Sequence, residues 1–409
     1  MISAPYIKHL PLEEVSLASA LKEGGYTTYH VGKWHLGGEE YSPVKHGFDI
    51  NIGGSHYGSP RFGYFSPYHL PNLEDGPKGE YLTDRLTDEA INLIHKENSR
   101  PYFLYMSYYS VHTPIQAPEH LVKKYEQKRK KMGLDKVQEF AIGERFPCEH
   151  KKFSRIRRRL VQSDPDYAAM VETLDTNIGR LLNAVKDAGE EDKTIVIFTS
   201  DNGGLATAEG SPTTNTPLSE GKGWMYEGGT REPLMIRWPG VTEQGTASSE
   251  PVSSPDFYPT ILEMAGLEPR PRQYVDGVSL VPILKHKKAE LEREGIFWHY
   301  PHYGNQGGTP GSSIRSGAFK LIEFFEDGRL ELYNLEDDIS EEYNLSTDDP
   351  DRTTELHQRL KEWRENVDAK IPKPNPDYGK PFKNLKDKII AAGVWFYYRY
   401  LIFKSKRKK

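Results

Sequence analysis

The sequence predicts an α/β protein in which a mostly parallel sheet is sandwiched by helices. Helical patterns alternate with short runs of β-branched and aromatic residues up to about residue 290, as in sheets covered on both faces. The pattern then changes, because two alternating strands flank Asp327-Gly328, a typical hairpin turn. We therefore expect an α/β domain over 1–290, a C-terminal subdomain of antiparallel sheet and helix over 291–376, and a basic, aromatic tail over 377–409.

The individual elements follow from periodicity and cap residues. Helices are expected over Leu12–Glu23, Leu82–Lys96, the stretch capped by Asp164-Pro165, Phe257–Ala265 and Glu355–Val367. Strands are expected over Tyr26–Val31, Tyr102–Tyr108, Thr194–Thr199, Pro233–Trp238, Ser313–Phe325 and Arg329–Leu335. The helix after Asp164 has the clearest apolar stripe, formed by Met170, Val171, Leu174, Ile178, Leu181, Leu182 and Val185. All residues of Thr194–Thr199 are β-branched or aromatic, which predicts a strand buried on both faces.

Composition excludes several classes of protein. The formal net charge of -5 over 409 residues does not suggest a nucleic-acid partner. A mean hydropathy of -0.70 with 11% aromatic residues favours a soluble enzyme over a membrane protein. The single cysteine rules out a disulfide within the chain, and no C-x-x-C pair suggests zinc. The N-terminal stretch MISAPYIKHL has no apolar segment behind basic residues, so no signal peptide is visible in it.

Polar residues follow the expected strands at one edge of the predicted sheet. Asp201 and Asn202 come directly after Thr194–Thr199, and their oxygens suit a divalent cation such as Ca²⁺ or Mg²⁺. Lys33 and His35 follow the first strand and would share a face if the extended chain continued to His35. His112 follows the second strand.

A second lysine, Lys222, joins these residues from the glycine-bracketed loop Gly221-Lys222-Gly223. Two lysines, two histidines and a carboxylate–amide pair at one edge suit displacement at a tetrahedral oxyanion. Lysines neutralise its oxygens, a cation polarises its centre, and histidines move protons near neutral pH.

Four stretches then carry a family resemblance: GKWHLG, HTP after an aromatic strand, SDNGG, and PLSEGKGWMYEGGTREPLMIRWPG. Together they resemble the formylglycine-dependent sulfatases of the alkaline-phosphatase-like superfamily. The similarity continues through DFYPTILEMAGL and DGVSLVPIL to about Pro376. It implies a sulfuric-ester hydrolase that uses formylglycine and one Ca²⁺, and that works in the periplasm or outside the cell.

The resemblance also assigns roles to residues of this chain. It implies that Asp201 and Asn202 bind Ca²⁺, that Lys33, Lys222 and His112 hold the sulfate group, and that His112 also protonates the departing alcohol. It makes His35 the base of the second half of the reaction. Ser219-Glu220 departs from the family, which has a basic or small residue there, and Glu220 either weakens sulfate attraction or points away.

The larger departure concerns the nucleophile, which this family forms by oxidising Cys or Ser within C/S-x-P-x-R. Cys148 lies in Pro147-Cys148-Glu149-His150, without the proline and arginine, and Ser3-Ala4-Pro5 has Ile7 in the arginine position. We therefore expect the chain to lack its first strand, its nucleophile segment and half of its metal ligands, and to be inactive as written. A misplaced start codon, a gene fragment or a partner chain would each account for this.

Three further features carry open alternatives. His299, Tyr300, His302 and Tyr303 are either core residues or side chains that reach the substrate pocket and contact a sugar. The basic runs Lys123–Lys131 and Lys151–Arg159, in a polar insertion near 120–163, are either solvated or a surface for a polyanionic sulfated glycan. The tail segment Ile389–Phe403 is shorter than the roughly 20 residues of a membrane span. It would lie on an anionic membrane surface, pack on the domain or bind a partner helix.

Two functional classes follow. The first is a sulfatase acting on carbohydrate sulfates or other sulfated small molecules, and the second is a non-catalytic relative that binds a sulfated ligand without cleaving it. A phosphoesterase of the same superfamily is a weaker third reading, because the two-metal His/Asp ligand set of phosphatases does not surround Asp201.

Overall fold

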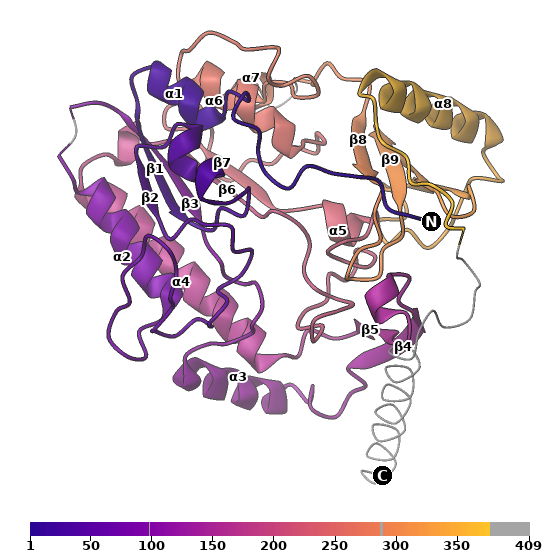
Figure 1. The fold of residues 1–409 in the computed structure, drawn as a ribbon, viewed down its shortest axis with the longest axis horizontal. Helices are drawn as coiled ribbons and strands as arrows, with labels where there is room; N and C mark the ends of the chain where they lie inside the picture. Colours follow the sequence, from indigo (N-terminus) through magenta and orange to yellow (C-terminus); the bar gives the residue numbers. More distant parts are fainter. Residues whose placement is uncertain (98, 287–288, 377–409) are drawn as a thin grey trace.

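The computed structural model describes residues 1–97, 99–286 and 289–376 (Figure 1). Its first sheet is parallel, with strand order β2-β1-β3. β1 (Thr27–Gly32) pairs in parallel with β2 (Ile50–Ile52) and with β3 (Tyr102–Ser107). Helices cover both faces of this sheet and an antiparallel sheet follows near the C-terminus, which confirms the predicted α/β class with a second, antiparallel part.

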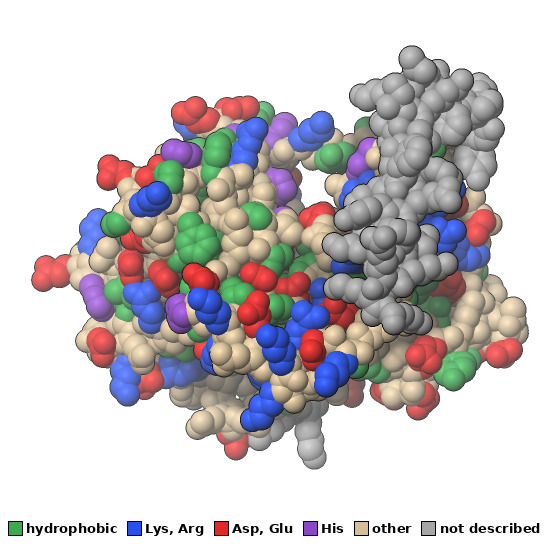
Figure 2. All heavy atoms as spheres, turned by 90° about the horizontal axis from the view of Figure 1, so that it is seen from below, with side chains coloured by type: hydrophobic (Ala, Val, Ile, Leu, Met, Phe, Trp, Pro, Cys, Tyr) green, Lys and Arg blue, Asp and Glu red, His purple; other side chains and the backbone are tan. Residues whose placement is uncertain are grey.

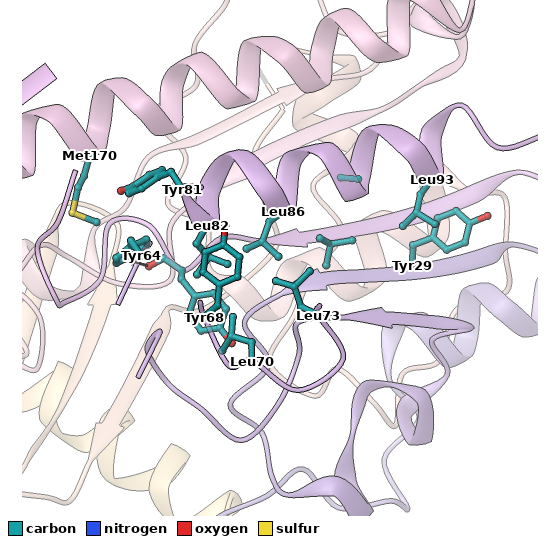
Figure 3. Close-up of a cluster of buried hydrophobic side chains, with 13 residues drawn as sticks. Tyr29, Tyr64, Tyr68, Leu70, Leu73, Tyr81, Leu82, Leu86, Leu93 and Met170 are labelled. Carbon is teal, nitrogen blue, oxygen red and sulfur yellow. Dashed lines mark hydrogen bonds between the residues drawn. The ribbon is translucent and has the colours of Figure 1, made fainter. Parts of the chain in front are cut away.

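One face of the parallel sheet is covered by α2 (Leu82–Ile94), which packs against the long helix α4 (Pro165–Asp187). Figure 3 shows side chains of α2 pointing toward the sheet, among them Leu82 and Leu86. Both leucines are fully buried, as burying apolar area provides the main driving force of folding. The other face is covered by α1 (Leu17–Glu23) and α6 (Phe257–Met264).

Two helix predictions needed correction in detail. α1 begins at Leu17 rather than Leu12, because the Ser16 hydroxyl accepts a hydrogen bond from Ser19 N and caps the helix there. In α4 the Asp164 cap is confirmed, since its carboxylate accepts from the backbone N–H of the first turn. However, Val171 and Leu182 of the predicted stripe are 44% and 45% exposed. The buried face instead includes polar residues such as Asn177, which bonds to α2.

The prediction of a strand before Asp201 was right, but the predicted burial of that strand was wrong. β6 (Val196–Thr199) is half-buried and its last residue, Thr199, is exposed, so it is not buried on both faces. It pairs antiparallel with β7 (Leu234–Arg237), and the two form a separate two-stranded sheet. The physical reason is that a run of β-branched residues favours a strand without specifying how many strands flank it.

The insertion between β3 and α4 is ordered. It contains α3 (Glu119–Lys131), which packs on α4, and the hairpin of β4 (Phe140–Arg145) and β5 (Arg155–Arg159). The hairpin packs against the loop over 205–213, where Arg159 N donates to Ala206 O at 2.9 Å. The second basic run is therefore only partly solvated, because Arg159 is buried.

The C-terminal subdomain is an antiparallel sheet of order β11-β10-β9-β8 covered by α8 (Pro350–Asn366). Its strands are β8 (Ile296–Tyr300), β9 (Gly311–Ser316), β10 (Phe319–Phe324) and β11 (Leu330–Asn334). The Asp327-Gly328 hairpin is confirmed, but the predicted strand Ser313–Phe325 is two strands, because Gly317 turns the chain with a φ of 57°.

The remaining elements are short: α5 (Glu227–Thr230), α7 (Val281–Lys285), and 3-10 turns at Glu39–Tyr41, Pro43–His46, Glu149–Lys151, Glu191–Lys193 and Ser254–Asp256. Within the described ranges, no helix has the length and apolar character needed to cross a bilayer. The tail segment Ile389–Phe403, with its proposed membrane contact, lies outside the described residues.

Candidate active site

Lys33 is positioned by a backbone hydrogen bond between the ends of two parallel strands, β1 and β3. Its backbone N–H donates to Ser107 O at 2.7 Å, just after β1 and β3 end. Gly32 makes this approach possible, since its φ is 108° and a Cβ there would lie 1.9 Å from Ser107 O. The sheet therefore fixes where the Lys33 side chain starts.

His35 reaches the site by a turn rather than by strand alternation. β1 ends at Gly32, and His35 has a φ of 59°, so the extended path expected from Lys33 to His35 is wrong. The backbone N–H of His35 donates to Ser55 O at 2.9 Å, which holds this turn. Its imidazole lies against Gly58, where a Cβ would come within 2.5 Å of the ring.

The pKa values show that the predicted basic residues share one electrostatic environment. Partial burial lowers the pKa of His35, and Lys33, His112 and Lys222 lower it further through their charges. Burial likewise lowers the pKa of Lys33, where Lys222 reinforces the effect and Asp201 opposes it. These mutual effects mean that the side chains lie within electrostatic reach of one another. The structure thus brings together these residues from four separate segments.

His112 is oriented by its neighbour. Its Nδ1 lies 3.0 Å from Thr113 O and is the donor in that contact, which leaves Nε2 as the nitrogen for a substrate. Burial lowers the pKa of His112, as do the charges of Lys222 and Lys33, whereas the hydrogen bond to Thr113 and the charge of Glu209 raise it.

The Lys222 loop is fastened to the segment that carries Asp201. Lys222 N donates to Gly204 O at 3.1 Å, and a Cβ on Gly221 would lie 2.3 Å from the same oxygen. Asn215 ties both ends, because its amide nitrogen donates to Gly204 O at 3.0 Å and to Glu220 O at 2.8 Å. Close backbone packing therefore sets the separation of Lys222 from Asp201.

One further acidic residue, Glu232, lies within electrostatic reach of Asp201. Burial, together with the charge of Asp201, raises the pKa of Glu232 to about 8. Within the described part of the chain, Glu232 Oε1 is buried without a hydrogen-bond partner. Asp201 itself is exposed, and Asn202 Nδ2 donates to Gly203 O at 3.0 Å. A bound cation would favour the charged form of Glu232, and the hard oxygens of Asp201 and Asn202 are donors that a cation prefers. The fit is partial, because residues 1–97, 99–286 and 289–376 contain no group of three His, Cys, Asp or Glu side chains arranged for a metal ion.

The acid that departs from the family pattern points away from Lys222. Glu220 accepts a hydrogen bond from Arg158 Nε of β5 at 2.7 Å. Burial raises the pKa of Glu220, and Arg158 opposes that rise. The second of the two expected alternatives for Glu220 therefore holds in the structure.

The candidate nucleophiles lie elsewhere. Cys148 is buried among Phe146, Ile156 and Ala208, and burial raises the pKa of its thiol. The Ser3-Ala4-Pro5 segment runs along the C-terminal subdomain, where Ala4 N donates to Pro301 O at 3.3 Å.

Of the C-terminal candidates, His299 is engaged within its own subdomain. Its Nδ1 lies 2.6 Å from Ser312 Oγ, and its Nε2 lies 3.1 Å from Lys370 O. The ring of His302 packs against those of Tyr6 and Tyr300. Within the ranges that the structure describes, no contact of either histidine reaches Lys33, His112 or Lys222.

Sequence reasoning missed Glu209, which contacts the neighbour of His112 from the loop over 205–213, and Gln306, which holds Glu209 from the subdomain. Thr113 Oγ1 donates to Glu209 Oε2 at 3.4 Å, and Gln306 Nε2 donates to Glu209 Oε1 at 3.0 Å. Gln306 belongs to the glycine-rich loop that follows Tyr303. No local pattern marks Glu209, and only its contact with Thr113 and its charge effect on His112 reveal it.

Comparison with known proteins decides the family. The profile described as "Sulfatase" matches residues 2–267, and one described as "N-sulphoglucosamine sulphohydrolase, C-terminal" matches residues 220–370. The chain belongs to the sulfatase family. Among curated relatives, a sulfatase of Formosa agariphila is 33% identical over 345 residues, covering 76% of this chain and 56% of that protein. N-acetylgalactosamine-6-sulfatase of Mus musculus is 31% identical over 71% of this chain and 52% of its own length. The chain thus spans about half the length of these relatives.

Solved sulfatase structures share the fold of this sulfatase chain. Ps i-CgsB in complex with k-i-k-neocarrahexaose superposes with a TM-score of 0.69 at 26% identity, over 89% of this chain and 77% of that one. BT4656 in complex with its substrate D-glucosamine-2-N,6-O-disulfate superposes with a TM-score of 0.68 at 22% identity, over 92% and 86% of the two chains. The latter likeness concerns the fold alone.

Proposed function

We propose that this sulfatase chain contributes the sulfate-binding and proton-transfer groups of a sulfuric-ester hydrolase acting on carbohydrate sulfates. The observation that carries the proposal is the shared electrostatic environment of Lys33, His35, His112 and Lys222 beside Asp201. Four basic groups near one carboxylate are costly to bring together unless an anion compensates their repulsion. A sulfate ester provides such an anion.

Each residue then has a chemical task. Lys33 and Lys222 offset charge on the sulfate oxygens as the ester bond to sulfur breaks. His112 carries a proton on Nε2 and delivers it to the departing alcohol oxygen, while Nδ1 remains bonded to Thr113 O. His35 accepts a proton in the step that frees sulfate. Burial and the nearby positive charges lower the pKa of His35, which favours the neutral ring that a base requires.

The proposed reaction also needs a nucleophile and a cation. When present, formylglycine supplies the attacking oxygen and Ca²⁺ polarises the sulfate. Asp201 and Asn202 would hold the cation. We place the nucleophile segment outside residues 1–409, because Cys148 is buried in an apolar cluster and lacks the proline and arginine of C/S-x-P-x-R. Within the described residues β3 pairs only with β1 and β6 only with β7, and Tyr105 of β3 is 48% exposed, which supports a further strand there.

The proposed substrate class rests on relatives. The similar proteins include an N-acetylgalactosamine-6-sulfatase and a sulfatase solved in complex with a neocarrahexaose. A sulfated sugar, free or in a glycan, is therefore the ligand we propose for this site. By the same resemblance, the place of action is the periplasm or the extracellular space.

The experiment compares the chain as given with a version extended by the coding sequence upstream of Met1. Sulfate release is measured from a sugar sulfate and from an aryl sulfate. We expect release only with the extended version, and we expect His112→Ala to slow the sugar sulfate more than the aryl sulfate, which needs little proton assistance. Lys186→Ala, an exposed lysine at the end of α4, is the matched control. Binding of the sugar sulfate without release by either version would instead identify a non-catalytic sulfatase relative.

A further inference from the structure

Glu209, close to His112, has a strained backbone conformation and a carboxylate that is hydrogen-bonded on both oxygens. It has a φ of 53°, in the left-handed region that non-glycine residues rarely adopt. Its two carboxylate oxygens have different partners: Gln306 Nε2 donates to Oε1 at 3.0 Å, and Thr113 Oγ1 donates to Oε2 at 3.4 Å. The carboxylate therefore joins the C-terminal subdomain to the segment that follows β3.

The contact with Thr113 continues to the imidazole of His112. Thr113 Oγ1 lies 3.3 Å from His112 Nδ1, and Thr113 O lies 3.0 Å from the same nitrogen. The hydroxyl proton points to Glu209, so the hydroxyl oxygen is a second, longer acceptor for the Nδ1–H that also donates to Thr113 O. A carboxylate, a hydroxyl and an imidazole thus form one chain, in which negative charge at Glu209 favours the protonated ring.

The remaining charged groups near His112 act in the opposite direction. Lys33, His35 and Lys222 face the same site, and burial together with both lysines lowers the pKa of His112. A leaving-group acid must keep its proton near neutral pH. Glu209 is the acidic group among the charges that act on His112, and it raises the pKa of the ring.

The loop that carries Glu209 is held from two sides. On one side β5 binds it, since Arg157 O accepts from Ser211 Oγ at 2.7 Å. On the other side the C-terminal subdomain binds it, since Gln306 O accepts from Thr207 Oγ1 at 2.6 Å. These bonds hold the backbone around Glu209 while its side chain remains exposed.

We propose that Glu209 is a positioning residue for His112, acting through the Thr113 hydroxyl to keep the imidazole oriented and protonated for the leaving alcohol. This inference rests on the proposed function of His112 as a proton donor. Glu209 itself does not touch the reacting atoms. Because its carboxylate is exposed and one hydroxyl away from the ring, solvent screens its effect, and we expect a shift of the His112 pKa of about 0.5 pH unit.

The test is an NMR titration of the chain labelled in its histidines, with the His112 signals assigned by their loss in His112→Gln. Glu209→Gln is expected to lower the His112 pKa by about 0.5 unit, and Thr113→Val to lower it similarly, while Thr113→Ser restores it. Glu126→Gln, an exposed acid on α3, is the control and should leave it unchanged. An unchanged His112 pKa in Glu209→Gln overturns the proposal.

A second readout separates this inference from the proposed function. In the extended, active version, Glu209→Gln should move the alkaline limb of the kcat/KM profile for a sugar sulfate to lower pH by the same amount. A shifted His112 pKa in a protein without sulfate release would support the coupling and refute the hydrolase. Sulfate release with an unmoved profile would refute the coupling and support the hydrolase.

Discussion

Arg158 of β5 donates through its Nε to the Glu220 carboxylate at 2.7 Å, two residues before Lys222. Its Nη1 and Nη2 donate to the carboxylate of Glu144 of β4, at 2.9 and 2.7 Å. Glu220 is 13% exposed at its side chain and Arg158 27%. The inserted hairpin thus compensates the charge of an acid that would otherwise reduce the attraction of the Lys222 loop for an anion.

Replacing Arg158 by Ala should destabilise the protein by about 2–3 kcal/mol, since it leaves Glu220 largely buried without its cation. Arg158→Lys should recover only part of this, because an ammonium does not reproduce the forked contact with Glu220 and Glu144. Urea unfolding measures both effects. Arg157→Ala removes an exposed arginine of the same strand and is the control. Equal losses in Arg157→Ala and Arg158→Ala would contradict the assigned role.

The titration of Glu341 should lower the unfolding free energy of the protein as the pH rises. Glu341 lies 3.0 Å from Lys320 in the interior, and burial raises its pKa to about 7. In the unfolded chain a Glu loses its proton near pH 4.3, so between about pH 4.3 and 7 the folded state binds more protons. The contribution of Glu341 to the unfolding free energy should drop by about 4 kcal/mol across that window. Glu341→Gln should flatten this dependence in thermal or urea unfolding, whereas Glu342→Gln, an exposed neighbour, should preserve it.

Lys222 should matter for every sulfate ester. Removing one preorganised charged contact to a developing anion typically reduces turnover by about 10²–10³. We therefore expect Lys222→Ala in the extended version to lower kcat on aryl and sugar sulfates alike. His112→Ala should discriminate between them. Turnover assays on both substrates decide this, and a Lys222→Ala variant that slows only one substrate would be inconsistent with sulfate binding.

Calcium should bind weakly to residues 1–409 alone. Asp201 and Asn202 contribute two protein ligands, whereas Ca²⁺ takes six to eight oxygens as a rule. In calorimetric titration we expect no tight, stoichiometric binding to the chain, and tight binding to the extended version. Asp201→Asn should weaken the latter. A submicromolar, one-to-one Ca²⁺ isotherm with the chain as given would disprove this prediction.

The last turn of α3 should mediate salt-dependent binding to a sulfated polysaccharide. Lys128, Lys130 and Lys131 are exposed there, and no ion pair joins them to another described residue. Acidic side chains are interspersed with basic ones on the face that Figure 2 shows, so we expect a weak interaction. Changing all three to Glu should lower the salt concentration that elutes the protein from heparin. The same change at Lys78, Lys186 and Lys193, which are exposed elsewhere, should do so much less.

Local signals in the sequence predicted local structure well. The Asp164-Pro165 cap and the Asp327-Gly328 turn each depend on neighbouring residues, and both form as expected. The burial of β6 and its antiparallel pairing with β7 depend on contacts with distant segments. No residue within the strand encodes them.

The same distinction applies to the candidate site. Strand ends predicted Lys33 and His112, because parallel strands deliver residues to one edge. The contact of Glu209 with Gln306 joins residues 97 positions apart, and the left-handed turn at His35 depends on a bond to Ser55. Tertiary contacts determine both, so the sequence pattern alone did not reveal them.

The buried ammonium of Lys320 binds Glu227 of α5 at 2.9 Å, across the boundary expected at residue 290. Separating the C-terminal sheet from α5 would leave Lys320 and Glu227 buried without their partner charges, at a cost of several kcal/mol. The C-terminal sheet should therefore not melt by itself. Hydrogen exchange in β10 and in the segment around Glu227 should proceed through the same opening event, so that one cooperative unit carries both Lys222 and the sheet that supports it.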